Sequence, residues 1–358
     1  MPQEEYQPFP VIKSKHSLVA KYVTPENWKQ LCQHATAKSG FTLDRAIACS
    51  VEFDNQHCGI YAGDHDSYTD FAKVFDPIIQ EYHGVDPQAK HTTDMDIEKI
   101  QGNIEPDVPV HYIRIRVSRS IDDFGLPPGM SKEERISIEN LMMNAFKKMR
   151  GDLAGTYQSL SEMDEKVQQQ LVDDHFLFMA GDPNLKIGGM ERDWPEGRGV
   201  FHNATKSFLV WVNEEDHVRA ISMDMGGDIK SVFSRLINGV NRIGESVTAD
   251  SVKGFCWSPK YGYINSCPTN LGTGMKATVH VDLPGWTKEG IDALKARSSQ
   301  LHVQPRGIRT GSTFKFSNKH SLGYSEVQII QCMIDAINTL YREDVQLQKK
   351  HGIFPYFP

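Results

Sequence analysis

Residues 267–274 read Cys-Pro-Thr-Asn-Leu-Gly-Thr-Gly: a thiol, a proline, an amide side chain and two glycines one residue apart. Glycines allow a tight turn, because they adopt backbone angles that other residues avoid. The turn leads into residues 275–283, where apolar and polar side chains alternate. Such alternation predicts a strand with one buried face. A thiol and an amide in a tight turn directly before a strand favour a functional loop over a structural one.

The same alternation recurs upstream at residues 111–117, and residues 207–212 and 218–223 are predicted to be two strands joined by an acidic turn. In the first of these segments the apolar residues share one face, while Arg114 and Arg116 share the other. Helical spacing of apolar residues appears in between, and the predicted helices are 131–146, opened by a Ser-x-x-Glu capping box, 232–240 and 325–337. Strands mixed with helices and tight hairpins predict an α+β domain with a mostly antiparallel sheet.

The first hundred residues are predicted to be mainly helical. Thr24 can cap a helix that has Pro25 at its first position. A second helix is expected over residues 68–82, with a kink at Pro77. A polar stretch ends near residue 107, so we expect a helical domain over 1–95 and a second domain over 108–358.

The composition excludes several classes of protein. The 358 residues carry a net charge of −7, which disfavours binding to nucleic acid or to an anionic membrane. No apolar run approaches the length of a membrane span. Six cysteines without Cys-x-x-Cys spacing favour reduced thiols over a disulfide framework or a zinc site. These features predict a soluble cytoplasmic enzyme.

Two groups of charged residues suggest chemistry. Arginines can bind phosphate through two parallel hydrogen bonds, and the candidates are Arg114, Arg116, Arg219, Arg306 and Arg309, the last two expected in a loop. Arginines at strand spacing are also commonly solvated or paired with carboxylates, so the alternative is that these arginines bind no phosphate.

The acidic turn at 214–216, Glu-Glu-Asp, could hold a guanidinium cation and accept a proton from it. An ordinary solvated turn is the alternative. Cys267 could be a thiolate of lowered pKa facing that cation, or a buried inert cysteine.

The octapeptide at 267–274, together with the segments 173–178, 193–203 and 208–219, resembles the signature sequences of the phosphagen (guanidino) kinases. That resemblance implies reversible, in-line transfer of a phosphoryl group between ATP and a guanidine. It also implies a small helical N-terminal domain and a larger C-terminal domain whose antiparallel sheet is flanked by helices. The segment 58–62, Cys-Gly-Ile-Tyr-Ala, is similar to the guanidine specificity loop of arginine kinases.

The resemblance assigns roles to individual residues. Glu215 would be the substrate carboxylate, Arg219 a phosphate clamp and Cys267 the substrate-side thiol. Glu214 and Asp216 would reach Mg²⁺ only through water molecules. The nucleotide, ATP or ADP, would be bound by Arg114, Arg116, His175, Arg219, Lys276, Arg306 and Arg309. The guanidine would meet Gly59, Ile60 and Tyr61 in addition to Glu215 and Cys267.

The sequence departs from the family pattern at four places. Lys276 stands where the family has arginine; lysine keeps the charge but loses the planar fork. Residues 310–315 form a shorter loop than in arginine kinases and contain no glutamate. Tyr112 and Ile113 replace small hydroxyl residues, and residues 55–56, Asn-Gln, replace loop-closing residues. Arginine is the expected substrate; the alternative is a homologue that binds nucleotide or guanidine with slow transfer or none. The length favours a monomer over a dimer.

Overall fold

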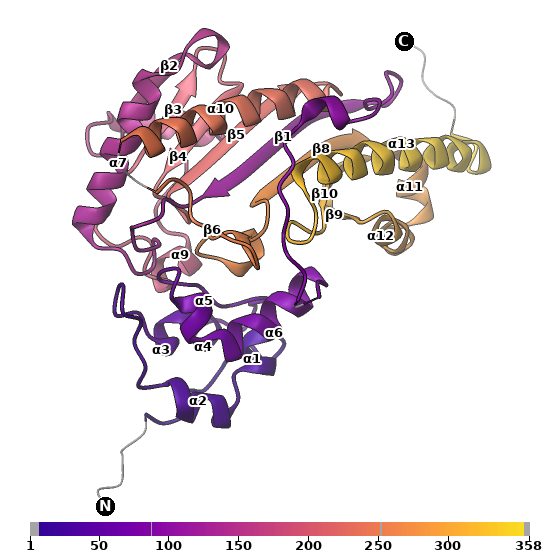
Figure 1. The fold of residues 1–358 in the computed structure, drawn as a ribbon. Coiled ribbons are helices and arrows are strands. Elements are labelled where there is room, and N and C mark those ends of the chain that lie inside the picture. The colour runs from indigo at the N-terminus through magenta and orange to yellow at the C-terminus, as the bar shows by residue number, and fades with distance from the viewer. Residues whose placement is uncertain (1–6, 87, 251–252, 354–358) are drawn as a thin grey trace, which may run out of the picture.

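The computed structural model describes residues 7–86, 88–250 and 253–353, with backbone only at 307–310. Figure 1 shows a small cluster of short helices, formed by the N-terminal residues, below a larger domain built around a sheet. This architecture confirms the predicted fold class. The helices of the small domain are α1 (Leu18–Tyr22), α2 (Pro25–Leu31), α3 (Leu43–Ala46), α4 (Ala48–Glu52), α5 (Ser67–Asp70) and α6 (Ala72–His83).

The predicted cap at Thr24 is confirmed, because its hydroxyl accepts from the backbone N–H of Asn27 and the Asn27 side chain accepts from Thr24 in return. The single helix expected over 68–82 is wrong. The chain divides into α5 and α6 at the fully buried Phe71, whose backbone leaves the helical region, and Pro77 lies inside α6.

The larger domain contains an eight-stranded sheet in the order β2-β3-β4-β5-β1-β8-β10-β9, with every neighbouring pair antiparallel. A separate two-stranded hairpin consists of β6 (Trp257–Ser258) and β7 (Gly262–Tyr263). The strands of the large sheet are β1 (Val110–Arg119), β2 (Gly155–Ser159), β3 (Gly199–Asn203), β4 (Phe208–Val212), β5 (Val218–Met225), β8 (Met275–Asp282), β9 (Val303–Thr310) and β10 (Thr313–Asn318).

Residues 306–309 were expected in a loop, and this expectation is wrong. They belong to strand β9 at the edge of the sheet, and a two-residue turn at 311–312 joins β9 to β10. Gly311 allows this turn because its φ is 59°. The shortened segment is therefore a tight β-hairpin.

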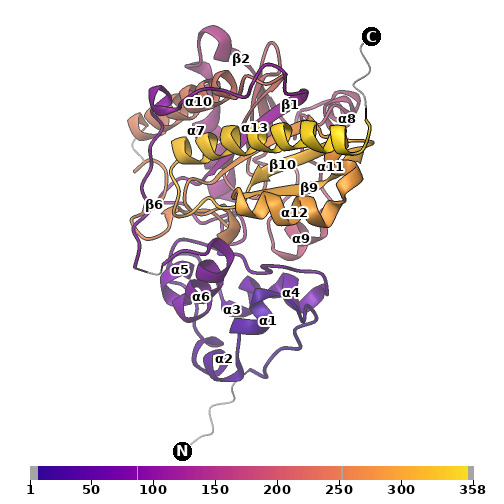
Figure 2. The same ribbon diagram turned by 90° about the vertical axis from the view of Figure 1, so that its right-hand side faces the viewer.

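The core of the larger domain lies between the sheet and three long helices, α7 (Lys132–Lys147), α10 (Ile229–Ala249) and α13 (Glu326–Lys350), which Figure 2 shows from the side. Ile113, Ile115 and Val117 of β1 are fully buried in this core. Capping boxes at Ser131 and Ser325 begin α7 and α13. The opposite face of β1 carries Arg114 and Arg116, so the amphipathic strand directs its cations away from the core.

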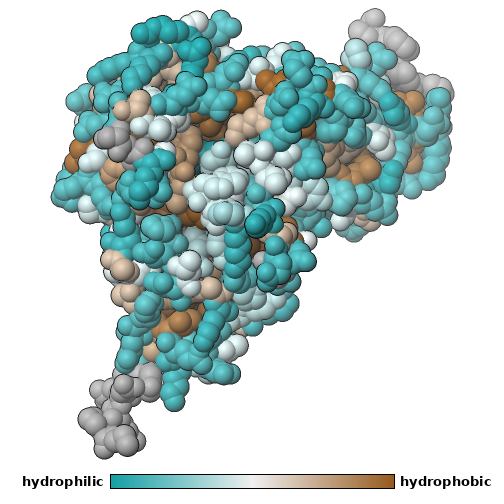
Figure 3. Space-filling model, viewed as in Figure 1, coloured by the Kyte–Doolittle hydropathy of each residue, from teal (hydrophilic) through white to brown (hydrophobic). Residues whose placement is uncertain are grey.

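Shorter elements complete the larger domain. They are α8 (Glu165–Asp173), α9 (Pro183–Ile187), α11 (Pro284–Glu289), α12 (Ile291–Gln300), η1 (Ile97–Lys99), η2 (Gly151–Leu153) and η3 (Pro268–Asn270). Hydrophilic residues cover most of the surface seen in Figure 3, and hydrophobic ones appear in small groups. Across the described ranges, every helix is too short or too polar to cross a bilayer.

Candidate active site

The acidic turn connects β4 to β5 and is held in place by the hydrogen bonds of the two residues that flank it. Asn213 has a left-handed backbone (φ 56°), and its side-chain amide donates to the carbonyls of Arg135 (3.0 Å) and Gly197 (2.7 Å). His217 closes the turn, because its carbonyl accepts from the Asn213 N–H (2.9 Å). Its Nδ1 accepts from the Ile121 N–H (2.9 Å), and burial lowers its pKa to about 4. The turn therefore presents Glu214 and Glu215 on a fixed support.

Both glutamates bind Arg219. The Nη1 atom of Arg219 lies 2.6 Å from Glu214 Oε2, and its Nη2 donates to Glu215. Burial alone would lower the pKa of Arg219, but Glu214 and Glu215 together with Asp216 raise it above its ordinary value. Burial raises the pKa of Glu214, although Arg219 opposes this shift. The result is a largely buried cluster in which one guanidinium bridges two carboxylates.

Asp216 does not fit its expected role near hydrated Mg²⁺. It is fully buried, and its oxygens accept from the Ser266 N–H (2.8 Å) and from the Asn270 side chain (3.2 Å). Burial, reinforced by Glu215, raises its pKa to about 6. Asp216 thus fastens the signature loop (residues 267–274) to the acidic turn. Among the residues that the structure describes, no three His, Cys, Asp or Glu side chains form a metal-ligand set.

Three cations lie side by side on the open face of β1 and β8. Arg116 is paired with Lys276 across the strands, and Arg114 lies two residues before Arg116 on the same face. The proximity of Arg219 lowers the pKa of Arg116 to about 10, with burial and Arg114 adding to the shift. Burial lowers the pKa of Lys276 to about 7, and Arg306 and Arg116 reinforce this. Such closely packed cations are what a polyphosphate would neutralise.

A pocket of about 80 Å³ opens between these cations and the signature loop. Arg116, Lys276 and Arg306 line it together with Asn270. Lys276 Nζ donates to the Asn318 carbonyl (2.9 Å), which holds its amine against the end of the neighbouring strand β10. Arg309 lies in the part of β9 whose side chains are outside the described residues.

A cleft of about 1130 Å³ continues from this pocket along the sheet. His175 and Arg114, both predicted to bind the nucleotide, line it, and Phe176 and Trp211 add aromatic walls. Arg114 lies 5.7 Å from the centre of the Trp211 ring.

The sequence raised the possibility that Tyr112 intrudes on bound phosphates, and the structure places its side chain in the large cleft, which Arg114 and Arg306 also line. Its hydroxyl donates to Met223 Sδ (2.8 Å), and its ring packs edge-on against His280. All three residues line the large cleft, and none of them lines the smaller cationic pocket. Ile113 lies on the other face, in the core.

Cys267 lies at the start of the signature loop and directly before η3. Its thiol contacts the Thr269 hydroxyl (3.1 Å) and hydrogen-bonds with the thiol of Cys58 from the small domain. The Cys58 contact and burial raise the pKa of Cys267 well above its ordinary value. This shift is opposite in direction to the depressed pKa considered for a thiolate that faces a cationic substrate, because a second thiol and burial act on Cys267 here.

The predicted specificity loop reaches this site across the domain boundary. The Ala62 N–H donates to the Ser266 carbonyl (2.8 Å), and Tyr61 lies near Cys267 and Glu215, which with burial raise the pKa of its phenol. Gly59 is required at its position, since its φ is 74° and a Cβ atom would lie 1.8 Å from Ser50 Oγ. Ile60 is fully buried in the core of the small domain, so a side-chain contact with substrate is excluded.

The replaced residue Gln56 takes part in closing this loop. Its side chain donates to the Asn184 side chain at 2.9 Å, and Asn184 belongs to α9 of the larger domain. Cys49 Sγ reaches the Asn184 carbonyl (3.4 Å). Gln56 and Asn184 therefore form a latch between the domains.

Sequence reasoning missed two residues at the end of α6. Tyr82 lines the cationic pocket, where its hydroxyl hydrogen-bonds with Arg306. His83, fully enclosed, contacts the Pro268 carbonyl of the signature loop through Nε2 (2.9 Å). Helical spacing could place Tyr82 on an inward face, but no sequence signal indicated that this face meets the other domain.

Comparisons with known proteins agree with this geometry. The family model described as "ATP:guanido phosphotransferase, C-terminal catalytic domain" matches residues 137–347, and the corresponding N-terminal domain model matches 13–80. The chain belongs to the ATP:guanido phosphotransferase family, which confirms the resemblance in the sequence.

Relatives in this family cover nearly the whole chain. An arginine kinase of Stichopus japonicus is 39% identical, over 98% of this chain and 96% of its own length. An arginine kinase of Anthopleura japonica is 44% identical over 95% of this chain, which spans about half (48%) of that relative. A crystal structure of lombricine kinase superposes with a TM-score of 0.89 at 34% identity, covering 96% of both chains. A substrate-free duplicated taurocyamine kinase from Schistosoma mansoni gives 0.88 at 32% identity over 95% of this chain and 48% of its own.

Proposed function

We propose that this chain is an ATP:guanidino phosphotransferase, with arginine as the expected acceptor. The observation that carries the proposal is the placement of the Glu214–Glu215 pair against Arg219 and close to Arg116 in the row of basic side chains, with Cys267 near Glu215 on the other side. One half of the site suits a guanidinium cation and the other suits a polyphosphate. Two relatives named as arginine kinases support arginine.

The residues would divide the reaction between them. Phosphoryl transfer needs positioning and charge stabilisation more than covalent help. Arg114, Arg116, Lys276 and Arg306 would hold the nucleotide phosphates in line, with Arg219 on the transferring group. A guanidine nitrogen would attack the γ-phosphorus as the bond to the ADP oxygen breaks, and Glu215 would accept the proton that the nitrogen loses.

Tyr61 and Cys267 would border the acceptor on the side of the small domain, and His175 would lie at the nucleotide. When bound, Mg²⁺ would neutralise phosphate charge. With no protein ligand set among the described residues, it would arrive with the nucleotide, and Glu214, rather than the buried Asp216, could reach it through water.

The test is phosphoryl transfer from magnesium ATP to arginine, creatine, glycocyamine, taurocyamine and lombricine, with nucleotide binding measured on the same sample. Turnover with arginine above the others is expected. Turnover with a different guanidine would correct the substrate, and absence of transfer to all of them at saturating nucleotide would refute the proposal.

The second candidate is a homologue that binds ligand without efficient transfer. Lys276 and the absence of a glutamate in the β9–β10 hairpin favour it. Nucleotide binding without turnover, together with activity gained in a Lys276→Arg variant, would establish this alternative.

Three further features belong to the proposal. We infer domain bounds of 1–95 and 108–358, a monomeric state and a cytoplasmic location. Size-exclusion chromatography with light scattering tests the monomer, and limited proteolysis between residues 95 and 108 tests the boundary.

A further inference from the structure

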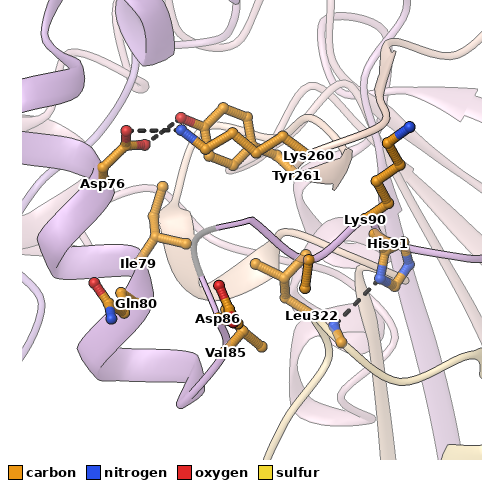
Figure 4. A pocket seen from close by; sticks show the side chains of 12 residues that line it. Asp76, Ile79, Gln80, Val85, Asp86, Lys90, His91, Lys260, Tyr261 and Leu322 are labelled. Atoms are coloured by element: carbon orange, nitrogen blue, oxygen red, sulfur yellow. Dashed lines mark hydrogen bonds and ion pairs between the residues drawn. The ribbon is translucent and has the colours of Figure 1, made fainter.

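The interdomain segment, which follows α6, first becomes hydrogen-bonded to the larger domain at residues 91–94. The His91 N–H donates to the Pro259 carbonyl (2.9 Å), and its Nδ1 accepts from the Gly323 N–H (3.3 Å; Figure 4). Three residues on, the Thr93 hydroxyl and the Asp94 N–H both donate to Glu326 Oε2, at 2.9 and 3.0 Å. Residues 91–94 are therefore fixed to the larger domain.

The chain just before this anchor has different surroundings. Gly84 ends α6 in the left-handed conformation (φ 65°), and residues 85, 86, 89 and 90 border the pocket drawn in Figure 4, opposite Ile79 and Leu322. The anchor at 91–94 thus follows the last helix of the small domain closely in the chain, so a rotation of the small domain would act on it.

Glu326 is an unusual anchor, because it is a fully buried carboxylate at the first position of α13. Its Oε2 accepts the hydrogen bonds from Thr93 and Asp94. Its Oε1 has no hydrogen-bond partner among the described residues. The nearest opposite charge is Arg119 Nη2, 3.9 Å from Oε1. A buried charge of this kind is retained only when another buried charge balances it.

Arg119, at the end of β1, is fully buried too. Its Nη1 donates to the carbonyls of Ser118 and Thr273, both at 2.8 Å, and its guanidinium lies 3.4 Å from the centre of the Tyr263 ring. Thr273 belongs to the signature loop. The next residue, Gly274, packs so tightly that a Cβ atom would lie 2.7 Å from the Ser118 carbonyl oxygen.

The signature loop in turn contacts the acidic turn of the site. It begins with Cys267, and Asn270 within it donates to Glu215 (3.3 Å) and Asp216 (3.2 Å). A path of polar contacts thus runs from Thr93 and Asp94, through the buried ion pair of Glu326 and Arg119, to the loop that touches the acidic turn.

We propose that Glu326 and Arg119 are a pair of positioning residues that tie the interdomain segment to the signature loop, so that movement of the small domain is transmitted to Cys267 and Asn270. The catalytic part of this inference rests on the proposed phosphotransferase function. Neither residue lines the large cleft or the cationic pocket. Their effect would therefore be on the position of the signature loop and not on contact with a ligand.

The test compares Glu326→Gln with Asp344→Asn. Asp344 is a fully buried carboxylate near the other end of α13, where it accepts from the Trp286 N–H (2.8 Å), so its variant controls for the loss of a buried charge. A glutamine at 326 can still accept from Thr93 and Asp94 but no longer balances Arg119.

Glu326→Gln is expected to lower kcat roughly ten- to hundredfold, because misplacing reacting groups by about 1 Å can cost that much. The KM for nucleotide should change less than about twofold, and Asp344→Asn should leave kcat unchanged at a temperature where both variants are folded. Arg119→Lys should have a similar effect, and the double variant should be little worse than either single one, since residues in one network are not additive. Equal kcat in Glu326→Gln and wild type, or full additivity of the two substitutions, would overturn the inference.

A second readout does not depend on turnover. The rate of Cys267 alkylation, followed peptide by peptide in a mass spectrometer, should rise severalfold in Glu326→Gln and stay at the wild-type rate in Asp344→Asn. If wild type transfers phosphate to no guanidine, the proposed function fails while this labelling still decides the anchor. If Glu326→Gln does not fold, Thr93→Val, which removes only the hydroxyl contact, should give a smaller rise in labelling, and an unchanged rate would then refute the anchor.

Discussion

Lys276 should gain a proton when nucleotide binds, and this proton uptake can be measured. Its amine is buried beside Arg306 and Arg116, with Lys315 further off, and these surroundings lower its pKa to about 7. At pH 8 about nine in ten unliganded molecules therefore carry a neutral Lys276, and at pH 6 about one in ten does. Bound phosphates would return the pKa toward its ordinary value of about 10.4. Nucleotide binding should then take up about 0.9 proton at pH 8 and about 0.1 at pH 6.

The sign of the pH dependence follows from this uptake. A ligand that binds together with a proton loses affinity as pH rises, so nucleotide affinity should fall by up to about tenfold per pH unit above the Lys276 pKa. Titration calorimetry in two buffers of different ionisation enthalpy counts the protons directly. The matched variant is Lys276→Arg, because arginine stays charged throughout this range, and subtracting its uptake removes the nucleotide's own titration.

Two results would refute this reasoning. One is a proton uptake below about 0.2 at pH 8 in wild type after the subtraction. The other is an equal pH dependence of affinity in wild type and Lys276→Arg. Either would mean that nucleotide binding does not change the protonation of Lys276.

Three further outcomes are expected. Glu215→Gln should reduce kcat by on the order of 10²–10⁴ while nucleotide affinity changes little, because the variant cannot accept the proton from the guanidine; stopped-flow binding and steady-state rates separate the two effects. The alkylation rate of Cys267 should be low at pH 7 and still rising above pH 9, because its pKa is raised and only the thiolate reacts, and nucleotide plus guanidine should slow it; a plateau below pH 8 would contradict this. Gln56→Ala should raise the guanidine KM by up to about tenfold through loss of the Asn184 hydrogen bond, with the exposed Asp54 varied in Asp54→Ala as control, and equal KM values in the two variants would remove the latch from substrate binding.

The parts of the fold that were predicted correctly are those with a strong local pattern. Strand β1 alternates so regularly that its core face and its arginine face could be assigned from sequence, and the Ser131 and Ser325 capping boxes mark where two long helices begin. Strand β9 was expected to be a loop, and it contains Pro305 and Gly307, which are unfavourable inside a central strand. An edge strand tolerates both, since one side of its backbone needs no ladder partner. The edge position is a property of the assembled sheet and cannot be seen in the segment itself.

The site divides in the same way. The charged residues of the acidic turn and of β1 were recognisable, because their spacing along strands and turns is local. The raised pKa of Cys267, the burial of Asp216 and the contacts of Tyr82 and His83 were not, since each depends on segments far apart in the sequence. Cys58 and Cys267, for example, meet only because the backbone of Ala62 pairs with Ser266 across the domain boundary. Local patterns thus identify residues of the site, and packing between the domains determines their burial, their contacts and their pKa values.

The pairing of Arg219 with Glu214 and Glu215 explains how so many charges coexist in the unliganded site. The basic side chains of β1 and β8 form one pole and the acidic turn forms the other, and Arg219 joins the two by ion pairs with both glutamates. A guanidinium substrate offers Glu215 the same fork of donors that Arg219 offers it now, while a phosphoryl group offers Arg219 a substitute for the carboxylate. Each ligand therefore replaces one half of an existing ion pair, and binding of both replaces the whole of it without leaving a buried charge unbalanced.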